Sequence, residues 1–120
     1  MRFTGLKYLQ LLACLGLFAC GSAERYDVVI VGGGASGTAA GLQAARMGER
    51  TLIVEEFDWL GGMLTSAGVS ATDGNYRLRG GIWDEFRTEL ARHYGCDSAL
   101  ITGWGSNVMF EPSGGDSIFK

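Results

Sequence analysis

A glycine-rich turn between a short apolar run and an alanine-rich segment is the feature that most constrains the fold. The β-branched residues 28–31 (Val-Val-Ile-Val) lead directly into glycines spaced as G-x-G-x-x-G. This order predicts a strand, a tight turn and the start of a helix, which is an α/β arrangement. Backbone N–H groups at such a turn, with the positive end of the helix dipole, suit the phosphates of a dinucleotide. The predicted contact residues are Gly32, Gly33, Gly34, Ala35, Ser36 and Gly37.

A second strand and an acidic residue extend the pattern. Small residues dominate 38–47, which predicts a helix packed close to a sheet, and the apolar run 51–54 predicts a second strand. Glu55 ends that run roughly 20 residues after the first glycine, the offset of an acid that binds an adenosine ribose. Glu56 is the alternative acid. A glutamate here disfavours a ribose 2′-phosphate, and therefore NADP.

Simpler interpretations exist for both features. The glycines can close a βαβ turn without a ligand, and Glu55 can be a solvated charge at a strand end. Strand, glycines, helix, second strand and acid all agree, however, and this agreement favours a dinucleotide site.

The composition and the single histidine narrow the function further. Hydrophobic residues make up 47% of the chain and charged residues 19%, with no basic run, so the sequence gives no support for nucleic-acid binding. His93 lies at the end of a predicted helix without a second cluster of ligands. We expect a solvated histidine there rather than a metal ligand or a catalytic base, and we predict no metal site.

A second glycine motif discriminates between cofactors. Residues 59–65 read Trp-Leu-Gly-Gly-Met-Leu-Thr, and residues 80–86 read Gly-Gly-Ile-Trp-Asp-Glu-Phe. With the first turn, these motifs resemble the family of FAD-dependent oxidoreductases with the glutathione-reductase-like flavin fold, over about residues 26–95. The resemblance is closest to members that read G-G-M-x-T. It implies the N-terminal βαβ unit of a Rossmann-type FAD-binding domain, and FAD rather than NAD.

The resemblance also implies where the cofactor lies. The glycine-pair loop runs along the flavin side in that family, which implies contacts from Gly62, Met63 and Thr65. The hydroxyls of Thr65 and Ser66 either bind cofactor or substrate or cap the local backbone, and the sequence favours neither. We expect FAD to be bound non-covalently, because no histidine lies near this loop.

One departure from the family pattern excludes the disulfide-reductase branch of the family. The disulfide-reductase members carry two redox cysteines after the glycine pair, whereas this chain has Leu64, Thr65 and Val69 there and no C-x-x-C pair. Thiol–disulfide chemistry needs two neighbouring sulfurs, so that branch is excluded. We expect an FAD-dependent oxidoreductase that acts on a small molecule. A non-catalytic fragment is the alternative, and an NAD-binding dehydrogenase is disfavoured by the glycine-pair loop.

The N-terminus predicts export. Basic residues at Arg2 and Lys7 precede an uncharged apolar run, 8–20, which is too short to span a bilayer but fits a signal peptide. Leu-Phe-Ala-Cys at 17–20 resembles a lipoprotein box with Cys20 as the lipidated residue. We expect a membrane-anchored lipoprotein of the bacterial envelope, with cleavage after Ala23 and a periplasmic or secreted protein as the alternative. The predicted divisions are a signal peptide at 1–19, a linker at 20–25 and the FAD-binding portion at 26–120.

The remaining sequence predicts one more helix and an incomplete sheet. A helical pattern starts at Gly81 and stops at Gly95, while Cys96 is expected to be structural or inert. Residues 113–116 (Ser-Gly-Gly-Asp) are a poor helix start, which argues against a helix over 113–120, where the family has one. Two strands and one crossover helix cannot cover both faces of a parallel sheet. We therefore expect the N-terminal part of a longer enzyme.

Overall fold

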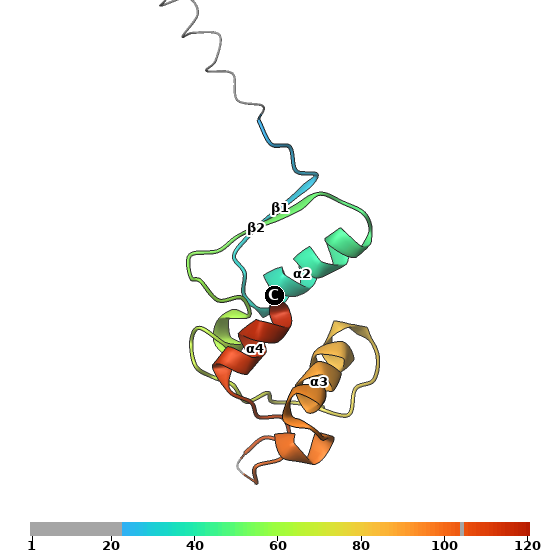
Figure 1. Ribbon diagram of the computed structural model, residues 1–120, viewed down its shortest axis with the longest axis vertical. Helices are drawn as coiled ribbons and strands as arrows, with labels where there is room; N and C mark the ends of the chain where they lie inside the picture. The colour runs from blue at the N-terminus through green and yellow to red at the C-terminus, as the bar shows by residue number, and fades with distance from the viewer. Residues whose placement is uncertain (1–22, 104) are drawn as a thin grey trace, which may run out of the picture.

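The computed structural model describes residues 23–103 and 105–120 of the chain (Figure 1). The predicted signal peptide and Cys20 lie outside the described residues. None of the helices in the described part of the chain combines the length and the hydrophobicity that spanning a bilayer requires. The elements follow in the order β1 (Val28–Val31), α2 (Ala35–Arg46), β2 (Thr51–Val54), η1 (Gly62–Leu64), α3 (Gly81–Tyr94), η2 (Asp97–Leu100) and α4 (Pro112–Phe119).

The first half of the chain is the predicted βαβ unit. β1 and β2 pair in parallel, from Val28 opposite Thr51 to Val31 opposite Val54, and α2 crosses between them. Gly41 lets α2 lie close to the sheet, because a Cβ there would stand only 2.5 Å from Ile53 Cδ1. The α/β prediction and both strand positions are therefore confirmed.

One face of this two-stranded sheet is open to solvent. β1 alternates between half-buried and exposed residues, and its outward side chains Val29 and Val31 are 55% and 85% exposed. Parallel strands in complete domains are usually covered on both faces. The sheet is thus incomplete in the part of the chain that the structure describes, as the sequence predicts.

The hydrophobic core lies in the second half instead. Its buried residues are Phe86, Leu90, Leu100, Val108 and Phe110. The Phe86 ring stacks on Phe119 at a centroid distance of 4.5 Å and meets Phe110 edge-on at 5.4 Å. This aromatic cluster joins α3, α4 and the segment before α4 into one unit, below the sheet in Figure 1.

The helix α3 confirms its sequence prediction. It begins at Gly81 and ends at Tyr94, and Gly95 follows in the left-handed conformation at φ 94°. Glycine tolerates this conformation because it has no Cβ. Phe86 and Leu90 face the core, four residues apart on one side of the helix.

The sequence argument against a helix in the last eight residues is wrong, because Pro112–Phe119 form α4. Pro112 occupies the first turn, where its fixed φ suits a helix start and its missing N–H costs no hydrogen bond. Gly114 and Gly115 lower the intrinsic propensity, yet both are buried. A Cβ at Gly114 would stand 2.9 Å from the Tyr94 hydroxyl, and one at Gly115 would stand 2.8 Å from Phe110. The glycines allow close packing, and this packing outweighs propensity.

Candidate functional site

Three glycines of the turn have different structural roles. Gly32 adopts φ 99°, a left-handed conformation that turns the chain out of β1. A Cβ at Gly37 would collide with the Gly32 carbonyl oxygen, so only glycine lets α2 start this close to the strand. A Cβ at Gly34, in contrast, would meet nothing within 4 Å. Gly34 therefore borders open space that a ligand can enter.

The start of α2 faces this open space with unpaired donors. Gly34 is the N-cap, no side chain caps the helix, and its first turn holds no acidic residue. The first N–H groups of an α-helix lack partners within the helix and carry the positive end of its dipole. Ala35 and Ser36 are exposed in this first turn, whereas the buried Thr38 donates its hydroxyl to the Gly33 carbonyl at 2.9 Å. The arrangement suits a phosphate.

Glu55 follows the last residue of β2, and its side chain binds the backbone of the glycine turn. Its carboxylate accepts the backbone N–H of Gly33, together with those of Glu56 at 2.9 Å and Phe57 at 3.2 Å. The N–H groups of Phe57 and then Gly33 hold the pKa of Glu55 below its ordinary value, so the group is a carboxylate near neutral pH. The Gly33 N–H is committed to Glu55, which leaves the donors at the helix start for a phosphate.

The Glu55 carboxylate still has acceptor capacity. A carboxylate offers about four acceptor positions, and the three backbone N–H groups occupy three of them. One position remains for a hydroxyl donor. Glu56, the alternative acid, is exposed.

The glycine-pair loop lies directly against the turn. Gly61 donates its N–H to the Gly33 carbonyl at 2.7 Å and forms a parallel bridge with Gly34. A Cβ at Gly62 would stand 2.9 Å from Gly34 Cα. The structure thus brings together the two glycine motifs, which α2 and β2 separate in the sequence.

Comparison with known proteins identifies the family of this chain. A model of the family described as FAD dependent oxidoreductase matches residues 27–120. The chain belongs to this family.

Two relatives show what share of a related protein this chain covers. A probable sarcosine oxidase of Arabidopsis thaliana is 44% identical over 48 residues, which are 40% of this chain and 12% of the relative. Beta-cyclopiazonate dehydrogenase of Aspergillus oryzae is 35% identical over 94 residues, 78% of this chain and 20% of that relative. The chain therefore spans at most a fifth of the length of these relatives. No solved structure matches it significantly.

The other predicted contact residues of this family member occupy different surroundings. Met63 is 67% exposed in η1, so its side chain is free to meet a ligand. Thr65 is only 1% exposed and donates its hydroxyl to the Leu60 carbonyl at 2.5 Å. Ser66 likewise donates to the Gly62 carbonyl at 3.1 Å. Of the two roles open for these hydroxyls, the structure shows local backbone capping.

The family motifs gave no indication of three residues that hold the loop. Leu60 packs under the turn, since a Cβ at Gly33 would stand 2.7 Å from its Cδ2. Asp116 of α4 and Lys120, which follows the end of α4, bind the backbone of the same loop. An Asp–Lys pair four residues apart is a recognisable helical signal. The glycines that precede Asp116 oppose this signal, because they lower the intrinsic helix propensity.

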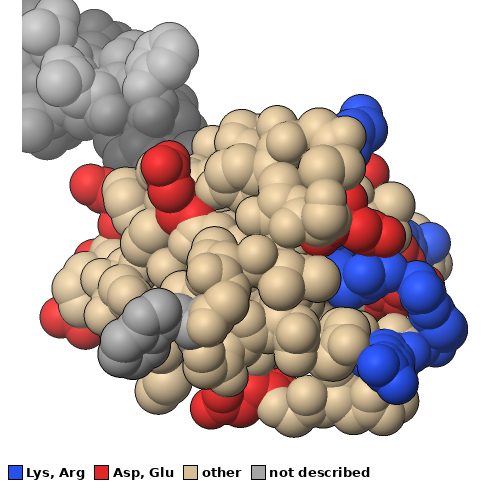
Figure 2. Space-filling view, turned by 90° about the horizontal axis from the view of Figure 1, so that it is seen from below, with Lys and Arg blue, Asp and Glu red and all other residues tan. Residues whose placement is uncertain are grey.

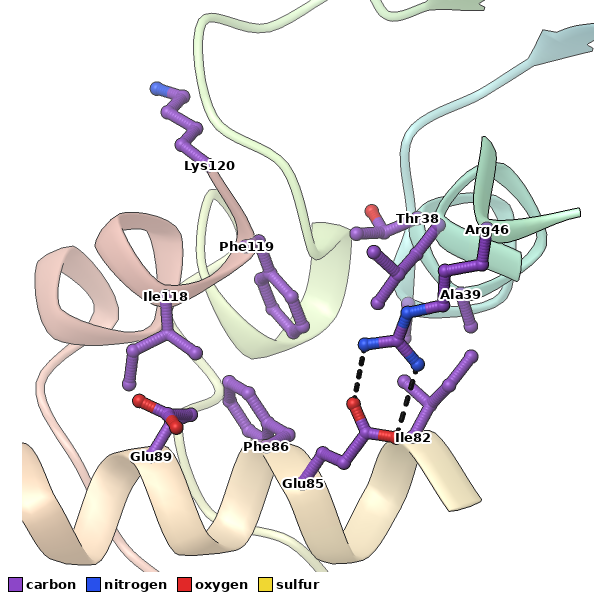
Figure 3. A pocket seen from close by; sticks show the side chains of 12 residues that line it. Thr38, Ala39, Arg46, Ile82, Glu85, Phe86, Glu89, Ile118, Phe119 and Lys120 are labelled. Atoms are coloured by element: carbon purple, nitrogen blue, oxygen red, sulfur yellow. Dashed lines mark hydrogen bonds and ion pairs between the residues drawn. The ribbon is translucent and has the colours of Figure 1, made fainter. Parts of the chain in front are cut away.

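A cavity of about 240 Å³ lies between α2, α3 and α4, apart from the turn (Figure 3). Its walls are largely apolar, and Arg46 and Glu85 form an ion pair across α2 and α3 at its edge. Of the predicted contact residues, only Ala35 lines it. The cavity therefore shares one residue with the predicted dinucleotide contacts and is otherwise separate from them.

The charged groups of the described residues form no further site. No cluster of three His, Cys, Asp or Glu residues that could hold a metal occurs among them. His93 is exposed and meets the Tyr94 ring edge-on at 4.8 Å. Cys96 is exposed, and its hydrogen bond with the Ser98 hydroxyl lowers the pKa of the thiol. On the face shown in Figure 2, basic atoms gather at one edge beside acidic atoms rather than forming a broad basic surface.

Proposed function

We propose that the glycine turn and Glu55 bind the ADP moiety of FAD non-covalently. The observation that carries this proposal is the open space at Gly34, bordered by the uncapped start of α2. Glu55 and the glycine-pair loop both bond to the neighbouring Gly33. The residues present fit a dinucleotide, because a side chain at Gly34 would fill the space that a pyrophosphate needs.

Each part of the ADP moiety has a matching group in this arrangement. The N–H groups at the start of α2 would bind the pyrophosphate. The free acceptor position of Glu55 would take a ribose hydroxyl, which is a donor. When bound, the flavin supplies the hydride-transfer chemistry, and the protein binds and orients it.

The finer family assignment is also part of the proposal. The G-G-M-x-T reading at the glycine pair supports a glutathione-reductase-like flavin fold without redox cysteines. The names of the two relatives specify different substrates, sarcosine and beta-cyclopiazonate. We therefore propose an oxidoreductase acting on a small molecule and assign no substrate.

The open sheet face supports a larger domain around this unit. Val29 and Val31 expose apolar surface on the face opposite α2, where a parallel sheet normally carries further elements. The matched relatives are at least five times longer than the matched region. We propose that the described residues form the ADP-binding part of a longer FAD-binding domain, and that isolated they turn over no substrate.

Ligand competition tests the assignment. FAD should bind the full chain, ADP should displace it, and FMN, which lacks the ADP moiety, should not. Equilibrium dialysis and flavin fluorescence measure all three affinities. Binding of FMN as tight as that of FAD would contradict ADP recognition. Tighter binding of NAD than of FAD would instead support the NAD-linked dehydrogenase.

Attachment to the membrane of a bacterial envelope through Cys20 remains a separate proposal. It rests on the apolar run and the lipoprotein-box resemblance at 17–20. Expression with a labelled fatty acid should label the protein, and Cys20→Ser should abolish the label. A mature protein that starts after Ala23 and carries no lipid would support simple secretion instead.

A further inference from the structure

The last helix holds the glycine-pair loop through a buried carboxylate. Asp116 of α4 is only 8% exposed, and its Oδ1 accepts the backbone N–H of Leu60 at 3.0 Å. Leu60 is 56 positions earlier in the chain and directly precedes Gly61. A buried carboxylate needs such donors, because an unpaired one would be strongly destabilising.

Lys120 completes the connection from the other oxygen of the same carboxylate. Its Nζ donates to Asp116 Oδ2 at 2.8 Å and to the Asp58 carbonyl, also at 2.8 Å. One carboxylate and one ammonium group therefore bind both a donor and an acceptor of the loop backbone. An ordinary ion pair between residues four apart on a helix surface would not reach a distant loop in this way.

The packing of Phe119 continues the connection to the glycine turn. A Cβ at Gly61 would stand 2.5 Å from Phe119 Cε2, so the loop backbone lies directly on this ring. Phe119 in turn stacks on Phe86 of the core. From Gly61 the loop bonds to Gly33, one residue before Gly34.

We propose that Asp116, with Lys120, is a positioning residue that sets the glycine-pair loop against Gly34. The inference rests on the proposed function, since the property it tunes is affinity for FAD. Asp116 touches the loop backbone, and it acts on the cofactor only through the position of Gly61 and Gly62. The aromatic core thereby stabilises a site that is built almost entirely from backbone.

Two variants and a control of the full chain test this inference. Asp116→Ala removes both bonds, whereas Asp116→Asn retains an oxygen that can accept the Leu60 N–H. Ser117→Ala is the matched control, because Ser117 is exposed on the same helix and bonds only within it, to the Ser113 carbonyl. Hydrogen exchange of the Leu60 and Gly61 amides reports the loop position, and flavin fluorescence reports FAD affinity.

The expected pattern is graded. Asp116→Ala should speed exchange at Leu60 and Gly61 and weaken FAD binding, each by about tenfold, the scale of one lost hydrogen bond to a charged group. Asp116→Asn should recover part of both losses, and Ser117→Ala should change neither. Exchange at Leu60 and Gly61 that stays at the wild-type rate in Asp116→Ala would overturn the inference.

A third variant covers the case in which Asp116→Ala fails to fold. Lys120→Met keeps the bond from Leu60 to Asp116 and removes the one to the Asp58 carbonyl. It should speed exchange in the loop by about threefold, since only part of the connection is lost. No change there would also overturn the inference. If wild type binds no FAD, the proposed function fails, while the exchange rates still decide whether Asp116 positions the loop.

Discussion

The βαβ unit and the α3–α4 core are stabilised in different ways. The βαβ unit has short strands, exposed valines on one face and a helix fitted closely through Gly41. The core around α3 and α4 is hydrophobic and partly aromatic, with Leu90 fully buried. The candidate site belongs to the first region, which has the weaker packing of the two.

The difference shows how a binding site made of backbone groups can keep its geometry. Gly34 and the start of α2 offer N–H groups and open space rather than packed side chains. The aromatic core holds these backbone groups in position through α4 and residues 58–62. The region that holds the cofactor site and the region that stabilises it are therefore separate parts of the chain.

The largest effect is expected from a cavity in the core. Leu90→Ala should lower the free energy of unfolding by about 2–5 kcal/mol, because Leu90 is 0% exposed. Leu78→Ala is the matched control, since Leu78 is 58% exposed, and it should stay within about 0.5 kcal/mol of wild type. Chemical denaturation measures both. Equal losses would mean that the core is not where stability resides.

A smaller and more local effect is expected in the turn. Gly37→Ala should cost about 1–3 kcal/mol by overpacking α2 against the Gly32 carbonyl. Hydrogen exchange should rise in α2 and the strands while α3 stays protected. Equal deprotection of α3 would contradict the separation of the two regions.

Glu55→Gln addresses the link between β2 and the turn. The loss of a charged acceptor should weaken FAD binding by roughly tenfold. Glutamine keeps the size of the side chain and serves as its own steric control. Unchanged affinity measured by fluorescence titration would exclude Glu55 from the ribose site.

The same carboxylate predicts a pH dependence. The folded state holds the Glu55 pKa below its ordinary value of 4.5. Its stabilising contribution is therefore complete above that value, and it is lost as the pH falls through the lowered pKa. The difference in unfolding midpoint between wild type and Glu55→Gln should be constant near neutral pH and disappear in acid. A difference that grows in acid would contradict the assignment.

The smallest effect is expected from the ion pair beside the cavity. Arg46 and Glu85 join α2 to α3, but their side chains are about half exposed, so water screens the pair. Arg46→Met should leave the unfolding midpoint within measurement error and FAD affinity unchanged. A clear loss of either would mean that the two regions are coupled here rather than through α4.

The sequence predicted those elements that local rules determine. The strands at 28–31 and 51–54 follow from β-branched runs, and the helix from Gly81 to Tyr94 follows from apolar spacing and a glycine stop. The contact of the two glycine motifs was predictable only through resemblance to a family. The helix at Pro112–Phe119 was not predicted. Its two glycines lower the helix propensity, and only the folded structure shows that they allow close packing against Tyr94 and Phe110. For the same reason the role of Asp116 as a partner of the loop could not be predicted from the sequence.

The measurement that tests the central claim most directly is an FAD titration of wild type and Gly34→Ala. The backbone of Gly34 at φ −61° suits alanine, and the added Cβ meets no protein atom within 4 Å. The variant should keep the circular dichroism and unfolding midpoint of wild type. Its FAD affinity should nevertheless fall by more than about tenfold, because the methyl group fills the space where the pyrophosphate approaches. A folded Gly34→Ala variant that binds FAD as tightly as wild type would contradict the account.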